Sequence, residues 1–341
     1  MIKVAFFGLE DWEKEYIKQL EEFKKLDMDK EFLGEFIDAD HMPKETDYEA
    51  ISIFVDSTID KKVLDKMPEL KFIDARSTGF DHIDIEECRK RGIEVSYSPS
   101  YGQRTVAEFT FALMLALTRK VYEGFNRIRE TGNFSVEGLR GIDLQDKTLG
   151  VLGTGRIGRN VIQIAKGFDM NVLAFDAYPN KEAADELGFE YADLKTVLAG
   201  SDIVTLHLPH TDETHHLINK DTIYDIKKGA FLINTSRGGI IQTEALVKAL
   251  KDEHLAGAGI DVMEEEGSIR DELEFLLDEN SKSESMKTVL ANHLLVDMPN
   301  VVITPHNAFN TWGALERILE TSVDNLEAFM GGEHINIVPK Q

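Results

Sequence analysis

One glycine motif limits the folds open to this chain more than any other feature of the sequence. The motif is Gly153-Thr154-Gly155-Arg156-Ile157-Gly158, and it directly follows a β-rich apolar run at residues 149–152. After the motif, apolar residues recur at helical spacing from Val161 to Phe168. A G-x-G-x-x-G sequence between a strand and a helix is typical of the first βα turn of a dinucleotide-binding domain. The sequence therefore predicts a nucleotide site here, with a ligand-free glycine turn as the alternative.

Each glycine of the motif has its own physical role. Gly153 permits the tight turn, Gly155 lets a pyrophosphate approach the backbone, and Gly158 lets helix and strand pack closely. The N–H groups of the helix N-terminus then face the phosphates. The next predicted strand, residues 171–175, is followed by Asp176, which lies 18 residues after Gly158. An acid at this place binds the ribose 2′-hydroxyl and repels a 2′-phosphate, so NAD is predicted rather than NADP.

Short β-rich runs alternate with helical patterns in two parts of the chain. In the first part, strands are predicted at 2–7, 50–55, 72–75 and 93–97, with helices at 12–23, 61–66 and 85–91. In the second part, six strands are predicted at 149–152, 171–175, 203–208, 230–234, 258–261 and 301–304, with helices at 159–166, 194–199 and 243–251. Parallel strands need crossovers, and the helices supply them. The sequence therefore predicts an α/β protein with two doubly wound parallel sheets.

Three further segments complete the predicted organisation. Residues 106–120 read as one long helix that is apolar nearly all round, so we expect it to be buried in a core or between domains or subunits. Residues 264–298 are polar and charge-rich, and we expect a long loop with a helix around 272–277. A final helix is predicted at 312–329. The 341 residues suit two domains, at roughly 100–200 residues per domain.

Composition excludes several classes of function. Asp and Glu number 62 against 38 Lys and Arg, which gives a formal charge of −24. Binding to nucleic acid or to an anionic membrane needs clustered basic residues, so neither is expected. No apolar stretch approaches the roughly 20 residues of a membrane span. The single cysteine, Cys88, and the lack of a signal-peptide pattern after Met1 favour a cytoplasmic protein.

Four polar residues lie at the ends of predicted strands in the second series: His207, Arg237, Asp261 and His306. Ligands of open parallel sheets bind beyond the carboxyl ends of the strands, so these side chains can converge on one cleft. Arginine can hold a carboxylate bidentately and polarise a carbonyl, and histidine can transfer a proton near neutral pH. The residues alone do not decide which histidine is the acid, and each of the four can instead be structural.

A metal site is the other interpretation of His207, His210, His215 and His216. Adjacent side chains such as His215 and His216 diverge on any regular element, and loop-forming residues fill positions 211–214. No metal is therefore predicted. The default for Cys88 is a buried small residue.

Several separate motifs resemble those of the D-isomer-specific 2-hydroxyacid dehydrogenases over essentially the full chain. They are STGFDHID at 77–84, YGQRTVAE at 101–108, LGTGRIG at 152–158, LHLP at 206–209, NTSRGG at 234–239, GIDV at 259–262 and TPHNAF at 304–309. Within the family, the chain looks most like the D-lactate dehydrogenase branch, by Tyr101, by the long stretch after Glu266 and by Pro305-His306 followed by Ala308-Phe309.

The resemblance implies a set of catalytic and substrate-binding residues. Arg237 is implied to bind the substrate carboxylate and keto oxygen, His306 to donate the proton, and Glu266 to pair with His306. A nearby carboxylate stabilises a protonated histidine, which suits proton donation during reduction. Further substrate contacts are implied at the backbone N–H groups of Thr78 and Gly79 and at the pocket positions Phe54, Tyr101 and Phe309.

The resemblance also implies the cofactor contacts and the architecture. It makes His207 a residue of the cofactor pocket rather than the acid. The NAD-binding domain is implied at 101–307, inserted into a flavodoxin-like substrate-binding domain of 1–100 and 308–341. The helix near 106–120 is implied to lie in a homodimer interface. The implied NAD contacts are Gly153, Gly155, Arg156, Ile157, Gly158, Asp176, Val106, His207, Pro209, Thr235, Ser236 and Asp261.

These features together predict NADH-dependent, reversible reduction of a small, pyruvate-like 2-oxo acid to the D-2-hydroxy acid. Glyoxylate, hydroxypyruvate and aromatic 2-oxo acids are alternative substrates, because apolar pockets discriminate by only about 1–3 kcal/mol per methylene. An NAD-sensing, corepressor-like protein without turnover is the alternative of a different class. Arg237, Glu266 and His306 together argue against a sensor, which needs none of them.

Overall fold

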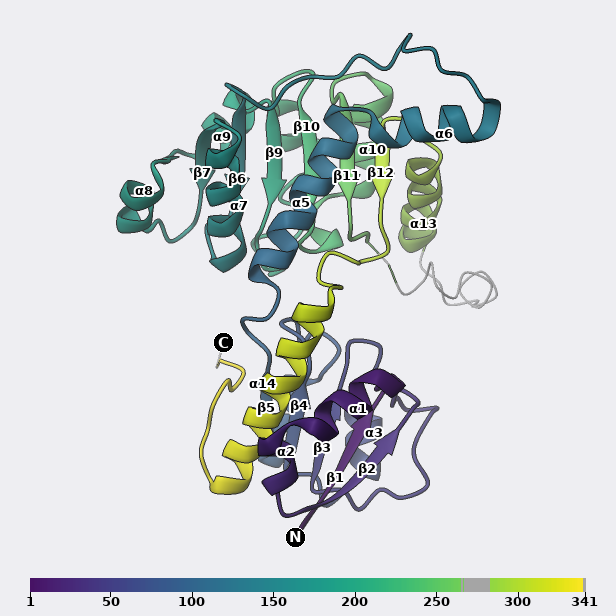
Figure 1. Ribbon diagram of the computed structural model, residues 1–341, viewed down its shortest axis with the longest axis vertical. Helices are drawn as coiled ribbons and strands as arrows, with labels where there is room; N and C mark the ends of the chain where they lie inside the picture. The colour runs from purple at the N-terminus through teal and green to yellow at the C-terminus, as the bar shows by residue number, and fades with distance from the viewer. Residues whose placement is uncertain (265, 267–282, 340–341) are drawn as a thin grey trace. The chain divides into compact units, whose positions relative to one another are not determined.

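Each of the two parallel β-sheets organises its own part of the chain (Figure 1). The computed structural model describes residues 1–264, 266 and 283–339. One unit contains Met1–Tyr101 and Asn310–Gln341, and the other contains Gly102–Phe309. The predicted class, an α/β protein with two parallel sheets, is confirmed.

The sheet of the first unit has five strands in the order β2-β1-β3-β4-β5, which is the flavodoxin-like order. Helices α1, α2 and α14 pack on one face, and α3 and α4 pack on the other. Because both faces are covered, the central strands β3 and β4 are buried along their length, and they are apolar apart from Ser52 and Asp74. The strands are β1 (Ile2–Phe7), β2 (Met28–Leu33), β3 (Ala50–Ile53), β4 (Phe72–Ala75) and β5 (Glu94–Tyr97). The helices are α1 (Asp11–Gln19), α2 (Glu21–Lys25), α3 (Lys61–Lys66), α4 (Ile85–Arg91) and α14 (Trp312–Gly331).

Two features of this unit differ from the prediction. Strand β2 was not predicted, because three of the six residues of this edge strand are charged and only Met28 in it is buried. The helix predicted at 12–23 is two helices, since Leu20 has an extended backbone and its side chain packs on the core. Neither glycine nor proline marks this break in the sequence.

A buried polar cluster attaches α14 to the first sheet. The Asp74 carboxylate accepts hydrogen bonds from Ser52 Oγ (2.7 Å), from Asn325 Nδ2 (2.8 Å) and from Ser322 Oγ. Next to it, the buried Arg76 guanidinium donates to Phe7 O at 2.6 Å and to Ser52 Oγ at 3.1 Å. Burial raises the pKa of the Asp74 carboxyl and lowers the pKa of Arg76 to about 10. Fixed hydrogen bonds thus favour the charged form of Asp74, and the carboxylates of Glu13 and Asp74 favour the charged form of Arg76.

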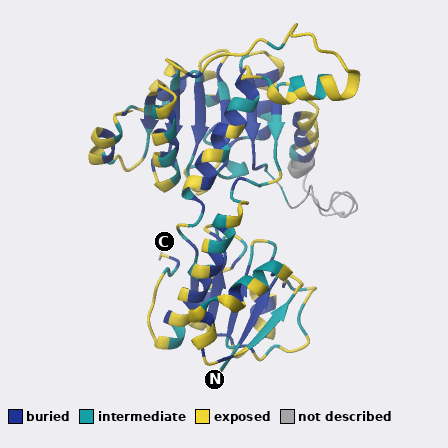
Figure 2. Ribbon diagram, in the orientation of Figure 1, coloured by how far each residue is buried: buried dark blue, intermediate teal, exposed yellow. Residues whose placement is uncertain are grey.

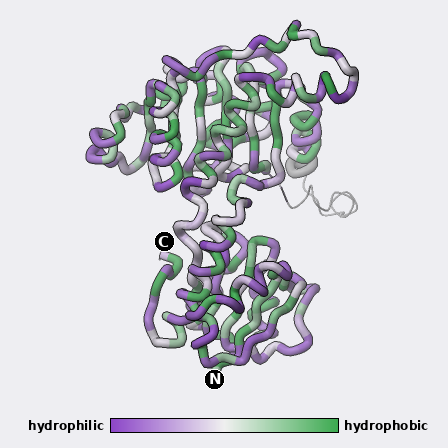
Figure 3. Tube along the Cα trace, in the orientation of Figure 1, coloured by the Kyte–Doolittle hydropathy of each residue, from purple (hydrophilic) through white to green (hydrophobic). Residues whose placement is uncertain are grey.

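The sheet of the second unit has seven strands in the order β12-β11-β10-β9-β6-β7-β8. Its first six strands in the chain run in the 3-2-1-4-5-6 order of dinucleotide-binding domains, and β12 extends the edge. The central strands β6, β9, β10 and β11 are the buried ones, as Figure 2 shows, and they are mostly apolar in Figure 3. They are β6 (Thr148–Leu152), β7 (Asn171–Phe175), β8 (Glu190–Tyr191), β9 (Ile203–Leu206), β10 (Phe231–Asn234), β11 (Gly257–Ile260) and β12 (Val301–Ile303). The helices are α5 (Gln103–Thr118), α6 (Val121–Thr131), α7 (Arg156–Gly167), α8 (Lys181–Leu187), α9 (Leu194–Gly200), α10 (Thr243–Lys251) and α13 (Ser283–Val296), with 3-10 turns η1 (Thr222–Asp225) and η2 (Gly238–Ile240).

Four helices and strands of this unit were not predicted: β8, α6, α8 and α13. The segment that includes Ser283–Val296 was expected to be a loop, and this part of the prediction is wrong. Val289, Asn292 and Leu295 are buried at a helical spacing that the polar surroundings obscure. The helix predicted around 272–277 lies outside the described residues.

Helix α5 is buried on one side only. Ala107, Phe111 and Met114 belong to the core, whereas Glu108 and Ala112 are exposed. The prediction that this helix is buried is therefore confirmed for one of its faces, and the opposite face is exposed. No helix in the described part of the chain combines the length and apolar character needed to span a membrane.

Candidate active site

The candidate residues of the second unit follow the carboxyl ends of neighbouring strands. Along this edge of the sheet, the strand order places them in a row. His306 follows β12, Asp261 and Glu266 follow β11, Arg237 follows β10, His207 follows β9, the glycine motif follows β6 and Asp176 follows β7. The strand ends thus bring the predicted nucleotide motif and the predicted reactive residues to one edge.

The three glycines of the motif have different surroundings. A Cβ atom on Gly153 would lie 2.5 Å from His207 O, and one on Gly158 would lie 2.0 Å from Gly153 O. Gly153 also has a φ angle of +94°, which favours glycine. A Cβ atom on Gly155 would meet nothing within 4 Å. Packing explains Gly153 and Gly158, whereas Gly155 faces open space in which a phosphate can approach the backbone.

Asp176 is bonded to the glycine motif itself. Its Oδ2 accepts hydrogen bonds from Thr154 N at 2.7 Å and from Thr154 Oγ1 at 2.8 Å, and its Oδ1 accepts from Tyr178 N at 2.8 Å. The Thr154 hydroxyl also lies 2.7 Å from the hydroxyl of Tyr191. The carboxylate is thus fixed beside the loop that would hold the dinucleotide phosphates.

His207 follows β9 with a histidine ring that is largely desolvated. Its Nε2 lies 3.0 Å from Thr205 Oγ1, and its buried Nδ1 has no hydrogen-bond partner among the described residues. Desolvation lowers the pKa of His207 from 6.5 to about 3. The ring is therefore neutral near neutral pH, which suits a residue of a cofactor pocket better than a proton donor.

The buried His207 ring predicts a pH-dependent stability. Below pH 6.5 the unfolded chain binds a proton at this residue, whereas the folded chain does so only near pH 3. The free energy of unfolding therefore falls as the pH drops through this window, by up to about 1.4 kcal/mol per pH unit from this residue. Above pH 6.5 this contribution does not change with pH.

Urea unfolding at a series of pH values between these limits tests this expectation. The His207→Gln variant should lose that part of the slope. Equal slopes for wild type and His207→Gln would contradict it.

A buried asparagine shapes the turn that carries Arg237. Asn234 Oδ1 accepts from Ser236 N at 3.0 Å and from Ser236 Oγ at 2.7 Å, and Asn234 Nδ2 donates to Arg237 O at 2.9 Å. Sequence reasoning gave Asn234 no role, although a polar residue at the end of a buried strand is a usable signal. The asparagine thus holds the backbone from which the Arg237 side chain projects.

His306 and Glu266 form the predicted pair. His306 Nδ1 lies 3.0 Å from Glu266 Oε2, and Glu266 Oε1 accepts from Met263 N at 2.8 Å. The His306 backbone has a φ angle of +51° and its N–H donates to Asp261 O at 2.8 Å. The ring of Phe309 lies edge-on to His306, with centroids 6.4 Å apart. This geometry leaves Nε2 as the ring nitrogen of His306 that faces away from Glu266.

Asp261 stabilises the loop that carries His306. The Asp261 side chain is 1% exposed and accepts from Thr304 Oγ1 at 2.5 Å, from Asn307 N at 2.8 Å and from Ala308 N at 2.9 Å. Both carboxylate oxygens are therefore used within the protein. The structure gives Asp261 this positioning role, and its cofactor contact stays a prediction.

The candidates of the first unit also follow strand ends. Thr78 and Gly79 lie in the loop after β4, where Thr78 Oγ1 donates to Ser98 O at 2.8 Å. The backbone N–H groups of Thr78 and Gly79 donate to no other residue that the structure describes. Phe54 follows β3 and is half-buried, and the carbonyl of Tyr101 accepts from Arg317 Nε at 3.0 Å. The two N–H groups are thus available for a ligand.

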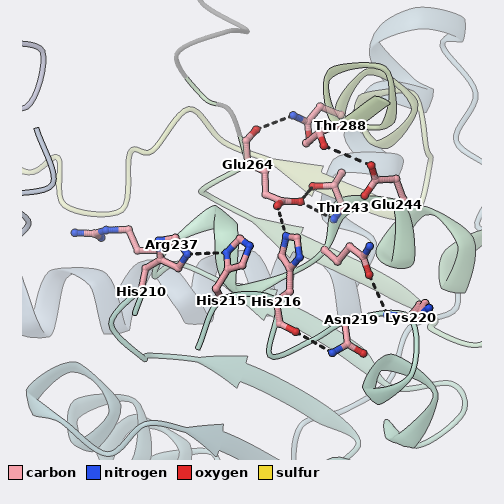
Figure 4. Close-up of polar contacts among 12 residues, drawn as sticks. His210, His215, His216, Asn219, Lys220, Arg237, Thr243, Glu244, Glu264 and Thr288 are labelled. Atoms are coloured by element: carbon pink, nitrogen blue, oxygen red, sulfur yellow. Dashed lines mark hydrogen bonds and ion pairs between the residues drawn. The ribbon is translucent and has the colours of Figure 1, made fainter. Parts of the chain in front are cut away.

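The histidines considered for a metal form a different arrangement (Figure 4). His210 Nε2 lies 3.0 Å from His215 Nδ1, and the rings of His215 and His216 stack with centroids 3.9 Å apart. The expected divergence of His215 and His216 is wrong, because they lie in a turn and His216 has a φ angle of +50°. Within the described residues, no three His, Cys, Asp or Glu side chains are placed to hold a metal ion.

Comparison with known proteins identifies the family. A model of the D-isomer specific 2-hydroxyacid dehydrogenase NAD-binding domain matches residues 111–308. The D-lactate dehydrogenase of Escherichia coli is 34% identical over 337 residues, which are 97% of this chain and 98% of that protein. This chain belongs to the D-isomer-specific 2-hydroxyacid dehydrogenase family. The predicted family, oxidoreductase class and NAD cofactor are confirmed.

Two further members of the family show its range. The solved structure of the D-lactate dehydrogenase from Aquifex aeolicus, complexed with NAD and lactic acid, has a TM-score of 0.83 and 35% identity. The match covers 97% of this chain and 96% of that chain. The glyoxylate reductase of Thermofilum pendens is 39% identical over 292 residues, which are 84% of this chain and 80% of that protein.

The residues around the glycine motif fit the NAD of the family. Gly155 is open to the surface at the N-terminus of α7, and Asp176 is fixed beside it. The other predicted NAD contacts lie in helices or follow strands, and they stay predictions. Arg156 is exposed and Ile157 half-buried in the first turn of α7, Val106 is buried in α5, Thr235 Oγ1 lies 3.0 Å from Thr110 Oγ1, Ser236 is half-buried and Pro209 is exposed.

Proposed function

We propose that this dehydrogenase reduces a small, pyruvate-like 2-oxo acid reversibly to the D-2-hydroxy acid with NADH. The observation that carries the proposal is the placement of Arg237 and the Glu266–His306 pair on neighbouring strand ends of the NAD-binding unit. Similarity to D-lactate dehydrogenases over nearly the whole chain supports a pyruvate-like substrate.

Each of the three residues has a distinct chemical task in this proposal. Bound NADH supplies the hydride. Arg237 is permanently charged, and its planar fork suits a carboxylate and the neighbouring keto oxygen. His306 gives the proton on Nε2 to the developing alkoxide. Glu266 holds His306 at Nδ1 and stabilises the charged ring before the transfer.

The remaining substrate contacts in this proposal come from residues of the first unit and from Phe309, the last residue of the second unit. The N–H groups of Thr78 and Gly79 bind the carboxylate, and Phe54, Tyr101 and Phe309 contact the substrate side chain. Residues 1–100 and 308–341 then form the substrate-binding domain, and residues 101–307 form the NAD-binding domain. The loop geometry of Thr78 supports its part, because the hydroxyl is bonded to Ser98 O.

Glyoxylate or hydroxypyruvate is the second candidate substrate. The observation that favours it is the 39% identity to the glyoxylate reductase of Thermofilum pendens over 292 residues. The identity to the Escherichia coli D-lactate dehydrogenase is lower, at 34%, although that match is longer, at 337 residues. Aromatic 2-oxo acids are a third option with the same chemistry. The choice depends on the side-chain contacts and not on Arg237 or His306.

The proposal is tested by following NADH absorbance with purified protein. Pyruvate, 2-oxobutyrate, phenylpyruvate, glyoxylate and hydroxypyruvate are offered in turn, with NADPH as the control cofactor. The highest kcat/KM is expected with pyruvate or 2-oxobutyrate, NADPH is expected to react poorly, and chiral analysis should find the D product. Preference for glyoxylate would favour the second candidate, and no reduction of any acid would overturn the proposal.

We also propose a homodimer in the cytoplasm. Helix α6 contains no buried residue and exposes Val121, Tyr122, Phe125 and Ile128, which supports an apolar contact with a second copy. Cys88 is a buried free thiol, which supports a reducing compartment. Light scattering during size exclusion should give twice the mass of one chain, and the mass of one chain would refute the dimer. Cell fractionation tests the location.

A further inference from the structure

Glu264 joins three separate segments of the NAD-binding unit (Figure 4). Its Oε1 lies 2.6 Å from His216 Nε2, and its Oε2 accepts from Thr243 N at 2.7 Å and from Thr243 Oγ1 at 2.5 Å. Its backbone carbonyl accepts from Asn292 Nδ2 at 2.9 Å. The carboxylate thus links the turn after β9, the start of α10 and, through its backbone, α13. The side chain is only 12% exposed, so these contacts are shielded from water.

The residues linked by this carboxylate hold the turn after Arg237 from two sides. On one side, the backbone of Met263 and Glu264 packs against Gly238, because a Cβ atom on Gly238 would lie 2.1 Å from Met263 O and 2.5 Å from Glu264 N. On the other side, His216 N donates to Gly239 O at 2.8 Å. The Glu264–His216 contact connects the two sides directly.

The neighbouring histidines fix the ring of His216. His215 stacks on it, and His210 lies 3.0 Å from His215 and packs on Gly239, where a Cβ atom would meet the His210 ring at 2.7 Å. Figure 4 shows the Arg237 guanidinium directed away from these rings. The histidines therefore support the backbone of the turn, whereas Arg237 Nη1 donates to Ser236 O at 2.8 Å.

The same segment leads to the second reactive group. Glu266 lies two residues after Glu264, and Met263 N donates to Glu266 Oε1 at 2.8 Å. The other oxygen of Glu266 faces His306. The position of the Met263–Glu264 backbone is thus shared by the Arg237 turn and by the Glu266–His306 pair.

We propose that Glu264 and His216 are positioning residues that hold Arg237 and Glu266 at a fixed separation for substrate reduction. This inference rests on the proposed roles of Arg237 and Glu266. Neither Glu264 nor His216 touches the substrate or NAD in this role. Displacement of reacting groups by about 1 Å is enough to cost about 10²-fold in rate, so a loose separation should lower kcat strongly.

The test compares Glu264→Ala and Glu264→Gln with a matched control. Glu264→Ala should lower kcat about 10- to 100-fold with little change in the NADH dissociation constant. Glu264→Gln keeps an oxygen for Thr243 and an amide for His216, so it should recover kcat to within about threefold of wild type. Glu244→Ala removes a neighbouring carboxylate of α10 that contacts Thr288 and not the Arg237 turn, and it should leave kcat unchanged.

His216→Ala and His216→Gln provide a second pair if Glu264→Ala does not fold. Glutamine can place an amide where His216 Nε2 lies, so His216→Gln should recover most of the kcat that His216→Ala loses. Rescue by each conservative variant separates positioning from general destabilisation, which would affect thermal unfolding without a selective loss of kcat.

Amide hydrogen exchange gives a readout that does not need turnover. Glu264→Ala and His216→Ala should speed exchange in residues 236–241 about tenfold or more, and Glu244→Ala should not. Unchanged exchange there, or wild-type kcat in folded Glu264→Ala, would overturn the inference. If the wild-type enzyme reduces no 2-oxo acid, the proposed function fails, and faster exchange in both variants would still support the role of Glu264 and His216 in holding the turn.

Discussion

The Arg237→Lys variant is expected to lose about 10²–10⁴-fold in kcat/KM for the preferred 2-oxo acid. The guanidinium fork can make two parallel hydrogen bonds to the carboxylate and keto oxygen, and each hydrogen bond to a charged group is worth about 1.5–3 kcal/mol. Lysine keeps the charge and lacks the fork. Steady-state kinetics measure the loss, and NADH fluorescence titration should give a dissociation constant within about threefold of wild type, because the glycine motif and Asp176 are unchanged.

A matched variant shows that the loss is local. Arg91→Lys changes an arginine that pairs with Glu87 and Asp65 at the surface of the first unit, and its kcat/KM should equal that of wild type. Wild-type kcat/KM in Arg237→Lys would remove the proposed role of Arg237. A nucleotide response without any turnover in the wild type would instead favour the NAD-sensing alternative.

The second large effect is expected at the buried cluster of the first unit. Asp74→Ala should destabilise this unit by about 3–5 kcal/mol, because it removes one of the two carboxylates, with that of Glu13, that favour the buried Arg76 charge. It also removes the acceptor for Ser52, Ser322 and Asn325. The attachment of α14 to the sheet should weaken first, since two of these donors belong to α14.

Tryptophan fluorescence measures this loss selectively. The chain has two tryptophans, Trp12 and Trp312, whose rings contact each other within the first unit with centroids 4.8 Å apart. The denaturant midpoint from this signal should fall in Asp74→Ala. Asp29→Ala, at an exposed acid of β2, should change the unfolding free energy by less than about 0.5 kcal/mol. Equal midpoints for Asp74→Ala and wild type would show that the cluster is not stabilising.

Local patterns predicted the parts of the site that depend on strand ends. The glycine motif, Asp176, Arg237 and His306 each follow an apolar run that the structure has as a strand, with ends that differ from the prediction by at most one residue. Apolar periodicity marks such runs in the sequence, and the parallel sheet then brings their carboxyl ends together. The roles of individual residues came from the family resemblance.

The supporting contacts had no comparable signal. Glu264 and His216 are 48 residues apart, and their pairing depends on how two loops pack. A run of three glutamates at 264–266 gives no reason to separate one from another, yet Glu264 binds His216 and Glu266 binds His306. The polar edge strand β2 and the helix α13 were missed for a related reason, because tertiary packing and not local periodicity defines them.

The hydrogen bonds of Asp176 have a consequence for how cofactor preference can evolve in this enzyme. The residue that would repel a 2′-phosphate also closes the loop through Thr154 N and Thr154 Oγ1. A substitution that merely removes the negative charge would open space for the phosphate and at the same time loosen the loop that cradles the dinucleotide. We therefore expect that a change of cofactor preference from NAD to NADP requires a neutral hydrogen-bond acceptor, such as asparagine or serine, at position 176 together with a new cationic side chain nearby. Two substitutions, and not one, would then be needed.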